Sequence, residues 1–241
     1  MLIDPAAPLR GPGGRLELAR ELLGAAQCVA VFTGAGISAE SGVPTFRGAD
    51  GWWRRYRPQD LANPLAFRDD PLLVWSWYAW RRELIARCEP NAAHYALARC
   101  VLESAGAWRI ITQNVDGLHQ RAIAELSGVA PGEVPNDLRP LALHGEIFRV
   151  RCPECGHAAP HLEPIDATSV ETLPCCPECG ALTRPAVVWF GESLDNTQLQ
   201  HAMGVAEHAD VGLVIGTSGL VQPAASLPHM TRQAGGRIIE V

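Results

Sequence analysis

The sequence predicts an α/β fold: a Rossmann-like parallel sheet with helices on both faces, joined to a small second domain. Short apolar runs rich in β-branched residues, beginning with 28–32, alternate with segments of helical periodicity. Such alternation is typical of parallel strands connected by crossover helices. Two stretches interrupt it, and we expect them to build the small domain as a helical insertion (48–105) and a zinc ribbon (151–185). The Rossmann-like domain is left with three segments: 14–47, 106–150 and 186–241.

The 241-residue chain is long enough to bury one sizeable core, or one core with a small satellite. Its formal net charge of −6 argues against a nucleic-acid-binding protein that works through a general basic surface. No uninterrupted apolar run approaches the roughly 20 residues needed to cross a bilayer. The first residues also lack the basic and apolar segments of a signal peptide. We therefore expect a cytoplasmic protein with no direct nucleic-acid or membrane partner. We also expect a monomer.

Up to about residue 105 the chain should be mainly helical around one buried strand, 28–32. Residues 1–13 are rich in Pro and Gly and predict a loose arm, whereas the leucines of 15–26 line one side of a helix. Aromatic residues between 71 and 88 cover much of the circumference of a helix, which predicts that this helix is buried. A further helix should run from 91 to 104, with Asn91 as its N-cap.

The second half of the chain returns to the alternation of strands and helices. Residues 141–143 predict a short strand that delivers His144 to a carboxyl strand end. We expect residues 186–190 to rejoin the parallel sheet after the zinc ribbon. The other expected strands are 108–112, 211–215 and 237–241, and the expected helices are 196–208 and 223–234.

A glycine-rich loop follows the first strand. Gly34, Gly36 and Ala39 have the G-x-G-x-x-G/A spacing that lets a backbone approach a diphosphate. A plain dinucleotide fold would continue into a helix and reach an acidic residue about 20 positions on, after a second strand. Here Pro44 ends the helix early, and no acidic residue at that distance follows a strand-like run. The loop therefore predicts a dinucleotide whose ribose is held in another way.

Four of the eight cysteines are spaced like zinc ligands. Cys152-x-x-Cys155 and Cys176-x-x-Cys179 are separated by 20 residues, which is a zinc-ribbon spacing. Four thiolates close the coordination tetrahedron and leave no open position. We therefore expect one structural zinc ion, not a catalytic one.

Other residues compete for places at this metal site. Cys175 is an alternative to Cys176, although Cys176-x-x-Cys179 repeats the turn of the first pair. His157 and His161 could also substitute. The remaining cysteines lie in apolar contexts and should be small buried hydrophobic residues in a reducing cytoplasm: Cys28, Cys88 and Cys100.

Together these motifs resemble those of the sirtuins, the NAD-dependent protein-lysine deacylases. The resemblance begins in the loop 34–48 and covers the chain, in the family's order, from about residue 15 to the last residue. Besides the cysteine pairs it includes the segments 112–119, 144–146, 188–192 and 216–218. It implies that the Rossmann-like domain binds NAD and that the partner is an acyl-lysine protein or peptide.

The resemblance implies that the acyl oxygen attacks C1′ of the nicotinamide ribose and that nicotinamide leaves. An alkylamidate then joins the sugar to the lysine. A base frees a ribose hydroxyl to attack the amidate carbon, which leads to O-acyl-ADP-ribose and free lysine. His144 matches the base, and the near-neutral pKa of histidine suits that task; alternatively, it only satisfies a strand end. Asn114 matches a residue that orders the ribose and nearby water, but Asn114 and Asp116 alone are typical of a turn that opens a helix. His119 should be a surface or supporting residue without a catalytic role.

Further residues match the family's cofactor and peptide sites. The expected cofactor-binding residues are Gly34, Ala35, Gly36, Glu40, Phe46, Arg47, Trp53, Gln113, Asn114, Val115, Asp116, Gly216, Thr217 and Ser218. A second segment should pair through its backbone with the substrate peptide as an added strand: Val188, Trp189, Phe190, Gly191 and Glu192.

A Tyr-x-x-Arg pair resembles the sirtuin subgroup that prefers succinyl, malonyl or glutaryl lysine over acetyl lysine. Tyr78 and Arg81 are three residues apart in an expected helix and so share a face. Arg81 would offer a fork of donors to a distal carboxylate, Tyr78 one hydroxyl, and Ala62 would leave room for the longer acyl group. The alternative is that Arg81, like Arg82, is a solvated helix charge. We expect a desuccinylase or demalonylase with weaker deacetylase activity.

The chain ends at Val241, where sirtuins continue into an asparagine-bearing loop that holds the adenosine ribose, so those contacts cannot be assigned here. The sequence does not decide whether the chain truly ends there. Two other functions stay open: a mono-ADP-ribosyltransferase that uses the same NAD site, and a non-catalytic NAD-sensing module stapled by zinc. The physiological substrates, the dominant acyl group and the oligomeric state lie beyond the sequence.

Overall fold

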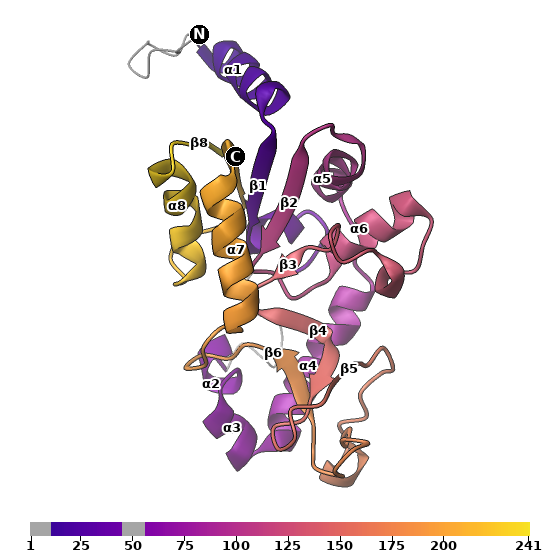
Figure 1. Ribbon diagram of the computed structural model, residues 1–241. Coiled ribbons are helices and arrows are strands. Elements are labelled where there is room, and N and C mark those ends of the chain that lie inside the picture. Colours follow the sequence, from indigo (N-terminus) through magenta and orange to yellow (C-terminus); the bar gives the residue numbers. More distant parts are fainter. Residues whose placement is uncertain (1–10, 45–55) are drawn as a thin grey trace.

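The computed structural model describes residues 11–44 and 56–241, with the side chains from residue 14 on. Three residues expected at the cofactor site, Phe46, Arg47 and Trp53, lie outside the described residues. The first half of the fold is a five-stranded sheet in the order β3-β2-β1-β7-β8 (Figure 1). All its pairings are parallel, as predicted. Its strands are β1 (Cys28–Thr33), β2 (Ala107–Thr112), β3 (Leu141–Ala142), β7 (Val211–Ile215) and β8 (Arg237–Glu240).

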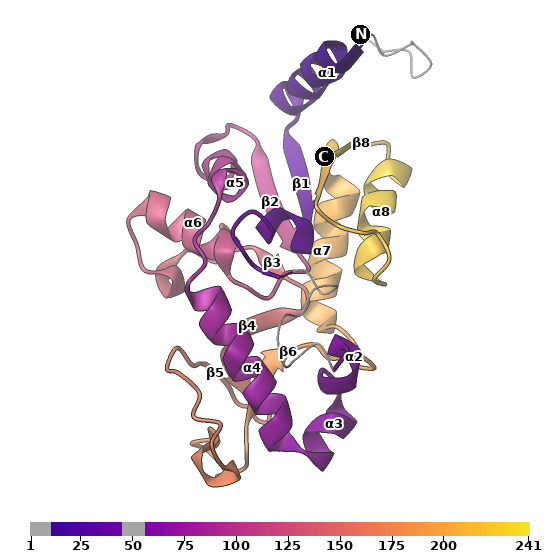
Figure 2. The same ribbon diagram turned by 180° about the vertical axis from the view of Figure 1, so that it is seen from behind.

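Helices cover both faces of this sheet because successive side chains of β1 point to opposite sides. Val29 and Val31 pack in one cluster with α5 (Ala92–Glu103) and α6 (Leu118–Ser127). Ala30 and Phe32 pack in a second cluster with α7 (Asn196–His208) and α8 (Leu227–Gln233). The two helical layers lie on opposite sides of the strands in Figures 1 and 2. A Rossmann-like arrangement is therefore confirmed.

The second half of the fold is an antiparallel sheet in the order β5-β4-β6, packed against three helices. Trp75, Tyr78 and Trp189 belong to its hydrophobic cluster, which confirms that the aromatic helix is buried. These elements lie below the parallel sheet in Figure 1. The strands are β4 (Gly145–Arg151), β5 (Ala158–Pro160) and β6 (Arg184–Val187), and the helices are α2 (Pro58–Leu61), α3 (Pro64–Asp69) and α4 (Pro71–Ala86).

The expectation that residues 186–190 rejoin the parallel sheet is wrong. The strand there is β6, which ends at Val187 and pairs antiparallel with β4. An apolar run indicates a buried strand but not its partner. The partner here is decided by β4, which continues directly after His144 and leads the chain away from the parallel sheet.

Helix α5 was expected in the helical insertion, but it packs on the parallel sheet. Leu97 and Ala98 share a cluster with Val29 and Ile110. We therefore propose that the helical insertion ends before α5, and that the zinc ribbon forms a unit with β4 and β6.

The boundaries of most other elements agree with the sequence. Helix α7 and strand β7 match their predicted ranges, and the Asn91 side chain caps α5 by accepting from the backbone N–H groups of Ala93 and His94. Helix α1 (Gly11–Ala25) begins earlier than predicted because Pro12 is tolerated in a first turn. The expected helix 223–234 is a 3₁₀ turn followed by α8. Other 3₁₀ turns are Ala35–Ser38, Pro131–Glu133 and Val170–Thr172.

Candidate functional site

Two of the predicted cofactor loops touch at the carboxyl edge of the parallel sheet. The Gly36 N–H donates to the Gly216 carbonyl oxygen at 2.8 Å, directly beyond the ends of β1 and β7. A Cβ atom on Gly36 would lie 2.7 Å from Gly216, and one on Gly34 would lie 2.9 Å from Thr217. Gly216 itself has a φ of +61°, in the left-handed region. Glycine is therefore required here, and the resulting backbone cradle suits a diphosphate, as the spacing predicts.

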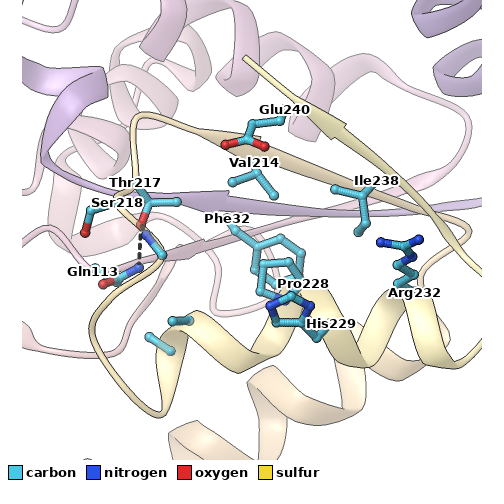
Figure 3. A pocket seen from close by; sticks show the side chains of 13 residues that line it. Phe32, Gln113, Val214, Thr217, Ser218, Pro228, His229, Arg232, Ile238 and Glu240 are labelled. Atoms are coloured by element: carbon cyan, nitrogen blue, oxygen red, sulfur yellow. Dashed lines mark hydrogen bonds between the residues drawn. The ribbon is translucent and has the colours of Figure 1, made fainter.

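The loop after β2 completes this edge. The Gln113 side-chain amide donates to the Thr217 hydroxyl at 3.1 Å, which joins the loop after β2 to the loop after β7 (Figure 3). Beside this contact lies a pocket of about 270 Å³ between the sheet and α8. It is lined in part by Phe32, Val214 and Ser218.

Sequence reasoning missed three polar residues of this pocket. His229 and Arg232 on α8 and Glu240 at the end of β8 line it together with Gln113 and Thr217 (Figure 3). Glu240 could have been predicted from its position in the sequence, since an acidic residue near the carboxyl end of a Rossmann strand is placed to bind a ribose. His229 and Arg232 could not have been predicted, because the sequence predicts their helix but not where it packs against the sheet.

Asn114 is held by a buried polar network beneath the glycine loop. Its amide nitrogen donates to the Gly34 carbonyl oxygen at 3.0 Å and to the Ser38 hydroxyl at 3.1 Å. The Ser38 hydroxyl in turn donates to the Asp116 carboxylate at 2.8 Å. Both hydrogens of the Asn114 amide nitrogen can thus be used within the protein, and the side-chain oxygen is the atom that can accept from another group. Ser38 was not predicted, since its partners lie 76 and 78 residues away.

Asp116 has two roles in the structure. One carboxylate oxygen accepts from Ser38, and the other accepts from the Leu118 backbone N–H at 2.9 Å, where α6 begins. The turn that opens a helix, which is the alternative interpretation of these residues, is thus present. It coexists with a contact to the predicted cofactor loop.

His119 is buried with 2% exposure, so the expectation of a surface position is wrong and a supporting position is left. Its Nε2 lies 3.0 Å from the Thr33 hydroxyl, which donates its own proton to Thr112. His119 Nε2 therefore carries a proton and donates. Burial, together with the neighbouring His94, lowers the pKa of His119 to about 3. The two rings lie 4.7 Å apart beneath the network, and His119 is neutral at ordinary pH.

His144 follows β3 at the carboxyl edge and is half-buried. Its Nδ1 lies 3.0 Å from the Gln113 carbonyl oxygen. A carbonyl can only accept, so Nδ1 carries the proton, and Nε2 has the lone pair in the neutral ring. Burial lowers the pKa of His144, and the bond to Gln113 opposes that shift. The geometry and the direction of the shift both suit a general base.

The segment Val188–Glu192 connects this histidine to the antiparallel half. The Val188 N–H donates to the His144 carbonyl oxygen at 2.8 Å, and the Phe190 N–H donates to the Ala62 carbonyl oxygen at 2.9 Å. The Trp189 N–H donates to the Glu192 carboxylate at 2.8 Å. A peptide strand added here would have to use other hydrogen-bonding groups of the segment.

Tyr78 and Arg81 share a face of α4, as their spacing predicts. The Arg81 guanidinium lies 5.8 Å from the Tyr78 ring centroid and 4.8 Å from that of Trp77. Burial lowers the pKa of Arg81, and the charges of Tyr78 and Asp116 oppose this shift. The half-buried Arg81 is therefore no solvated surface charge.

Arg82 does not fit the alternative of a solvated charge either. It is 4% exposed and donates to the backbone carbonyl oxygens of Ile147, His161 and Glu163. Its guanidinium joins α4 to β4 and to the ribbon. Burial lowers the pKa of Arg82 to about 10.

The four predicted zinc ligands come together. The sulfur atoms of Cys152, Cys155, Cys176 and Cys179 all lie within 4.8 Å of one another. The Cys175 sulfur points instead to the Leu173 carbonyl oxygen, so Cys176 is the correct choice. Among the described residues no histidine belongs to this group. Four converging thiols and no other donor are the ligand set of a closed structural zinc site.

The remaining predicted residues are less constrained. Ala35 is half-buried and Glu40 is exposed, while the Val115 carbonyl oxygen accepts from the Ile147 N–H at 2.9 Å. Of the three other cysteines, Cys88 is buried as expected, whereas Cys28 and Cys100 are half-buried. Among the described residues no helix is long and apolar enough to span a membrane.

Comparison with known proteins identifies the family. Residues 34–223 match the Sir2 family. The chain is 48% identical over 222 residues to NAD-dependent protein deacylase 2 of Pyrobaculum aerophilum, covering 92% of this chain and 82% of that protein. The fold matches a crystal structure of a Sir2 homolog–NAD complex with a TM-score of 0.82 and 45% identity, over 93% of this chain and 81% of that one. A mutant Sir2 homologue in complex with 2′-O-acetyl ADP ribose matches with a TM-score of 0.80 and 46% identity, over 93% of this chain and 83% of that one. The glycine cradle, the histidine at the strand end and the four-cysteine cluster thus lie in a chain that belongs to the Sir2 family.

Proposed function

We propose that this protein is an NAD-dependent protein-lysine deacylase. One observation carries the proposal above the others: at the edge of the sheet where the glycine cradle and Asn114 meet, His144 places Nδ1 against the Gln113 carbonyl oxygen, which makes Nε2 the basic nitrogen of the neutral ring. Its relatives support the same activity. One is named an NAD-dependent protein deacylase, and another is a Sir2 homolog whose structure was solved with NAD. The substrate would be an acyl-lysine in a protein or peptide.

NAD, when bound, supplies an electrophilic ribose carbon that accepts the acyl oxygen as nicotinamide leaves. The residues of this chain would bind and orient the reactants. The backbone of Gly34, Gly36 and Gly216 would hold the diphosphate, because only glycine lets the two loops approach this closely. Asn114, fixed through its amide nitrogen, would present its oxygen to the ribose or to water.

His144 would accept the proton of a ribose hydroxyl at Nε2. The Gln113 carbonyl holds the proton of the ring on Nδ1, so the basic nitrogen is Nε2 in each turnover. The lowered pKa of His144 keeps the ring unprotonated near neutral pH. The zinc ion would be held by the four cysteines and would stabilise the antiparallel half without taking part in the reaction.

We further propose that acidic acyl groups, such as succinyl or malonyl, are preferred over acetyl. The half-buried guanidinium of Arg81 and the hydroxyl of Tyr78 lie on one face of α4. Ala62, a small residue, belongs to the same hydrophobic cluster as Tyr78. Burying a carboxylate without a partner is costly, whereas a guanidinium and a hydroxyl supply charge-assisted hydrogen bonds. None of the eight cysteines is paired in a disulfide, which supports a reducing compartment, and we propose a cytoplasmic monomer.

The test is to incubate the protein with NAD and a succinyl-lysine peptide. Nicotinamide should be released only when the peptide is present, and faster than with the acetyl-lysine form of the same peptide. Nicotinamide release without an acyl-lysine would instead indicate an ADP-ribosyltransferase. Binding of NAD with no turnover would indicate a sensing module.

A further inference from the structure

The hydroxyl of Tyr78 has one of its hydrogen-bonding roles already filled. The indole Nε1–H of Trp189 donates to it at 2.9 Å, and both side chains are 2% exposed. An indole N–H can only donate, so the Tyr78 oxygen is the acceptor in this bond. The proton of the hydroxyl is not used by Trp189. Within residues 11–44 and 56–241, no hydrogen bond from this hydroxyl to an acceptor is observed.

The indole is itself held rigidly. The Arg184 guanidinium lies 3.3 Å from the Trp189 ring centroid and pairs with the Glu192 carboxylate. The same carboxylate accepts from the Trp189 backbone N–H at 2.8 Å, which fixes the start of the side chain. The Phe67 ring also contacts the indole, with 5.4 Å between centroids. The direction of the indole N–H is thus determined by several independent contacts.

We propose that Trp189 is a positioning residue for acyl selectivity. By donating to the Tyr78 oxygen, the indole leaves the hydroxyl proton directed away from Trp189, and this proton would then be available to the distal carboxylate of an acidic acyl group. A hydroxyl that already accepts a hydrogen bond is also a stronger donor. Arg81, on the same face of α4, would bind the other side of the carboxylate. This inference rests on the proposed preference for acidic acyl groups.

The test compares succinyl-lysine with butyryl-lysine in one peptide, since butyryl has the same number of carbons and no carboxylate. Trp189→Phe keeps an aromatic ring under Arg184 but removes the N–H donor. We expect the succinyl-to-butyryl ratio of kcat/KM to fall about threefold to tenfold, as for the loss of one positioned hydrogen bond. In a Tyr78→Phe background, Trp189→Phe should cause no further change in that ratio.

Trp75→Phe is the matched control. Trp75 is fully buried in the same cluster, and its indole N–H donates at 2.9 Å to the Thr183 carbonyl oxygen, not to Tyr78. Losing that donor should affect both peptides by the same factor. A ratio that changes equally in Trp75→Phe and Trp189→Phe would overturn the inference, because both effects would then be structural.

The outcomes separate the inference from the proposed function. A wild-type protein with no preference for succinyl-lysine would contradict the proposed preference. A clear preference that Tyr78→Phe lowers and Trp189→Phe leaves unchanged would overturn the role of Trp189 alone.

A second measurement does not depend on the folding of Trp189→Phe. In protein with ¹⁵N-labelled tryptophan, the Trp189 indole resonance should shift on adding succinyl-lysine peptide and in Tyr78→Phe. It should shift less with the butyryl-lysine peptide. Equal shifts with both peptides would overturn the inference.

Discussion

The imidazole Nδ1 of His144 donates to the backbone carbonyl oxygen of Gln113 across 3.0 Å, which joins the end of β3 to the loop after β2. Gln113 also binds Thr217 through its side chain, so one residue contacts both the predicted base and the second backbone cradle. The orientation of His144 is therefore coupled to the loops that would hold the cofactor.

Replacing His144 with Tyr should abolish most deacylation and leave NAD binding within a few-fold of wild type. A general base contributes about 10² to 10⁴ in rate and little to ground-state affinity. Kinetics on an acyl-lysine peptide, with calorimetry for NAD, would measure the two effects. His201→Gln, an exposed histidine on α7, is the control and should be neutral. A His144→Tyr protein with more than about a tenth of wild-type activity would contradict the base role.

The free energy of unfolding should decrease as the pH falls from 6.5 toward 3. Burial lowers the pKa of His119 from 6.5 to about 3, so below pH 6.5 the unfolded chain binds a proton that the folded chain rejects. His94, whose pKa is also lowered by burial, acts in the same direction, while Asp116 opposes that shift. The stabilisation is complete above the unfolded pKa, and each such group removes up to about 1.4 kcal/mol per pH unit below it.

Urea unfolding at several pH values would test this account. His119→Gln should be less stable overall but should lose stability less steeply between pH 6.5 and 5. Equal slopes for the two proteins would mean that His119 is not the group that titrates on unfolding.

The protein should bind one zinc ion per chain, and Cys152→Ser should unfold or aggregate. Structural zinc binding is itself folding free energy, so a lost ligand destabilises the whole antiparallel half. Cys175→Ser is the matched control, because its sulfur contacts the Leu173 carbonyl oxygen and not the cluster. Metal analysis and thermal unfolding would compare them. A soluble, metal-free Cys152→Ser protein with normal activity would refute the structural role.

Arg81→Met should lower kcat/KM on succinyl-lysine about tenfold to several hundredfold and change acetyl-lysine activity little. The loss combines charge-assisted hydrogen bonds with a carboxylate left unpaired. Arg82→Met is the contrast: it should destabilise the protein, because three backbone carbonyl oxygens lose their donor, without changing acyl selectivity. If Arg81→Met depresses both activities equally, Arg81 has only a structural role.

The sequence predicted the parallel sheet well because periodicity and length are local signals. Helix α7 and strand β7 match to the residue, and Asn91 caps α5 as expected. The antiparallel pairing of β6 with β4 was missed, since an apolar run does not specify its partner.

Individual residues of the candidate site could be predicted where they belong to a sequence motif, as His144 and the four cysteines do. The network of Ser38, His94 and His119 was not, because its contacts join residues distant in sequence. The direction of the Trp189 indole toward Tyr78 likewise depends on tertiary packing across 111 residues. The predicted roles of Phe46, Arg47 and Trp53 stay predictions.

The most direct test of the proposed function is a mass balance of the products. The protein, NAD and a succinyl-lysine peptide would be combined, and nicotinamide, free-lysine peptide and O-succinyl-ADP-ribose would be quantified in the same sample. We expect the three to appear in equal amounts and none to form when either substrate is omitted. Free lysine formed without NAD, or nicotinamide formed without free lysine, would contradict it.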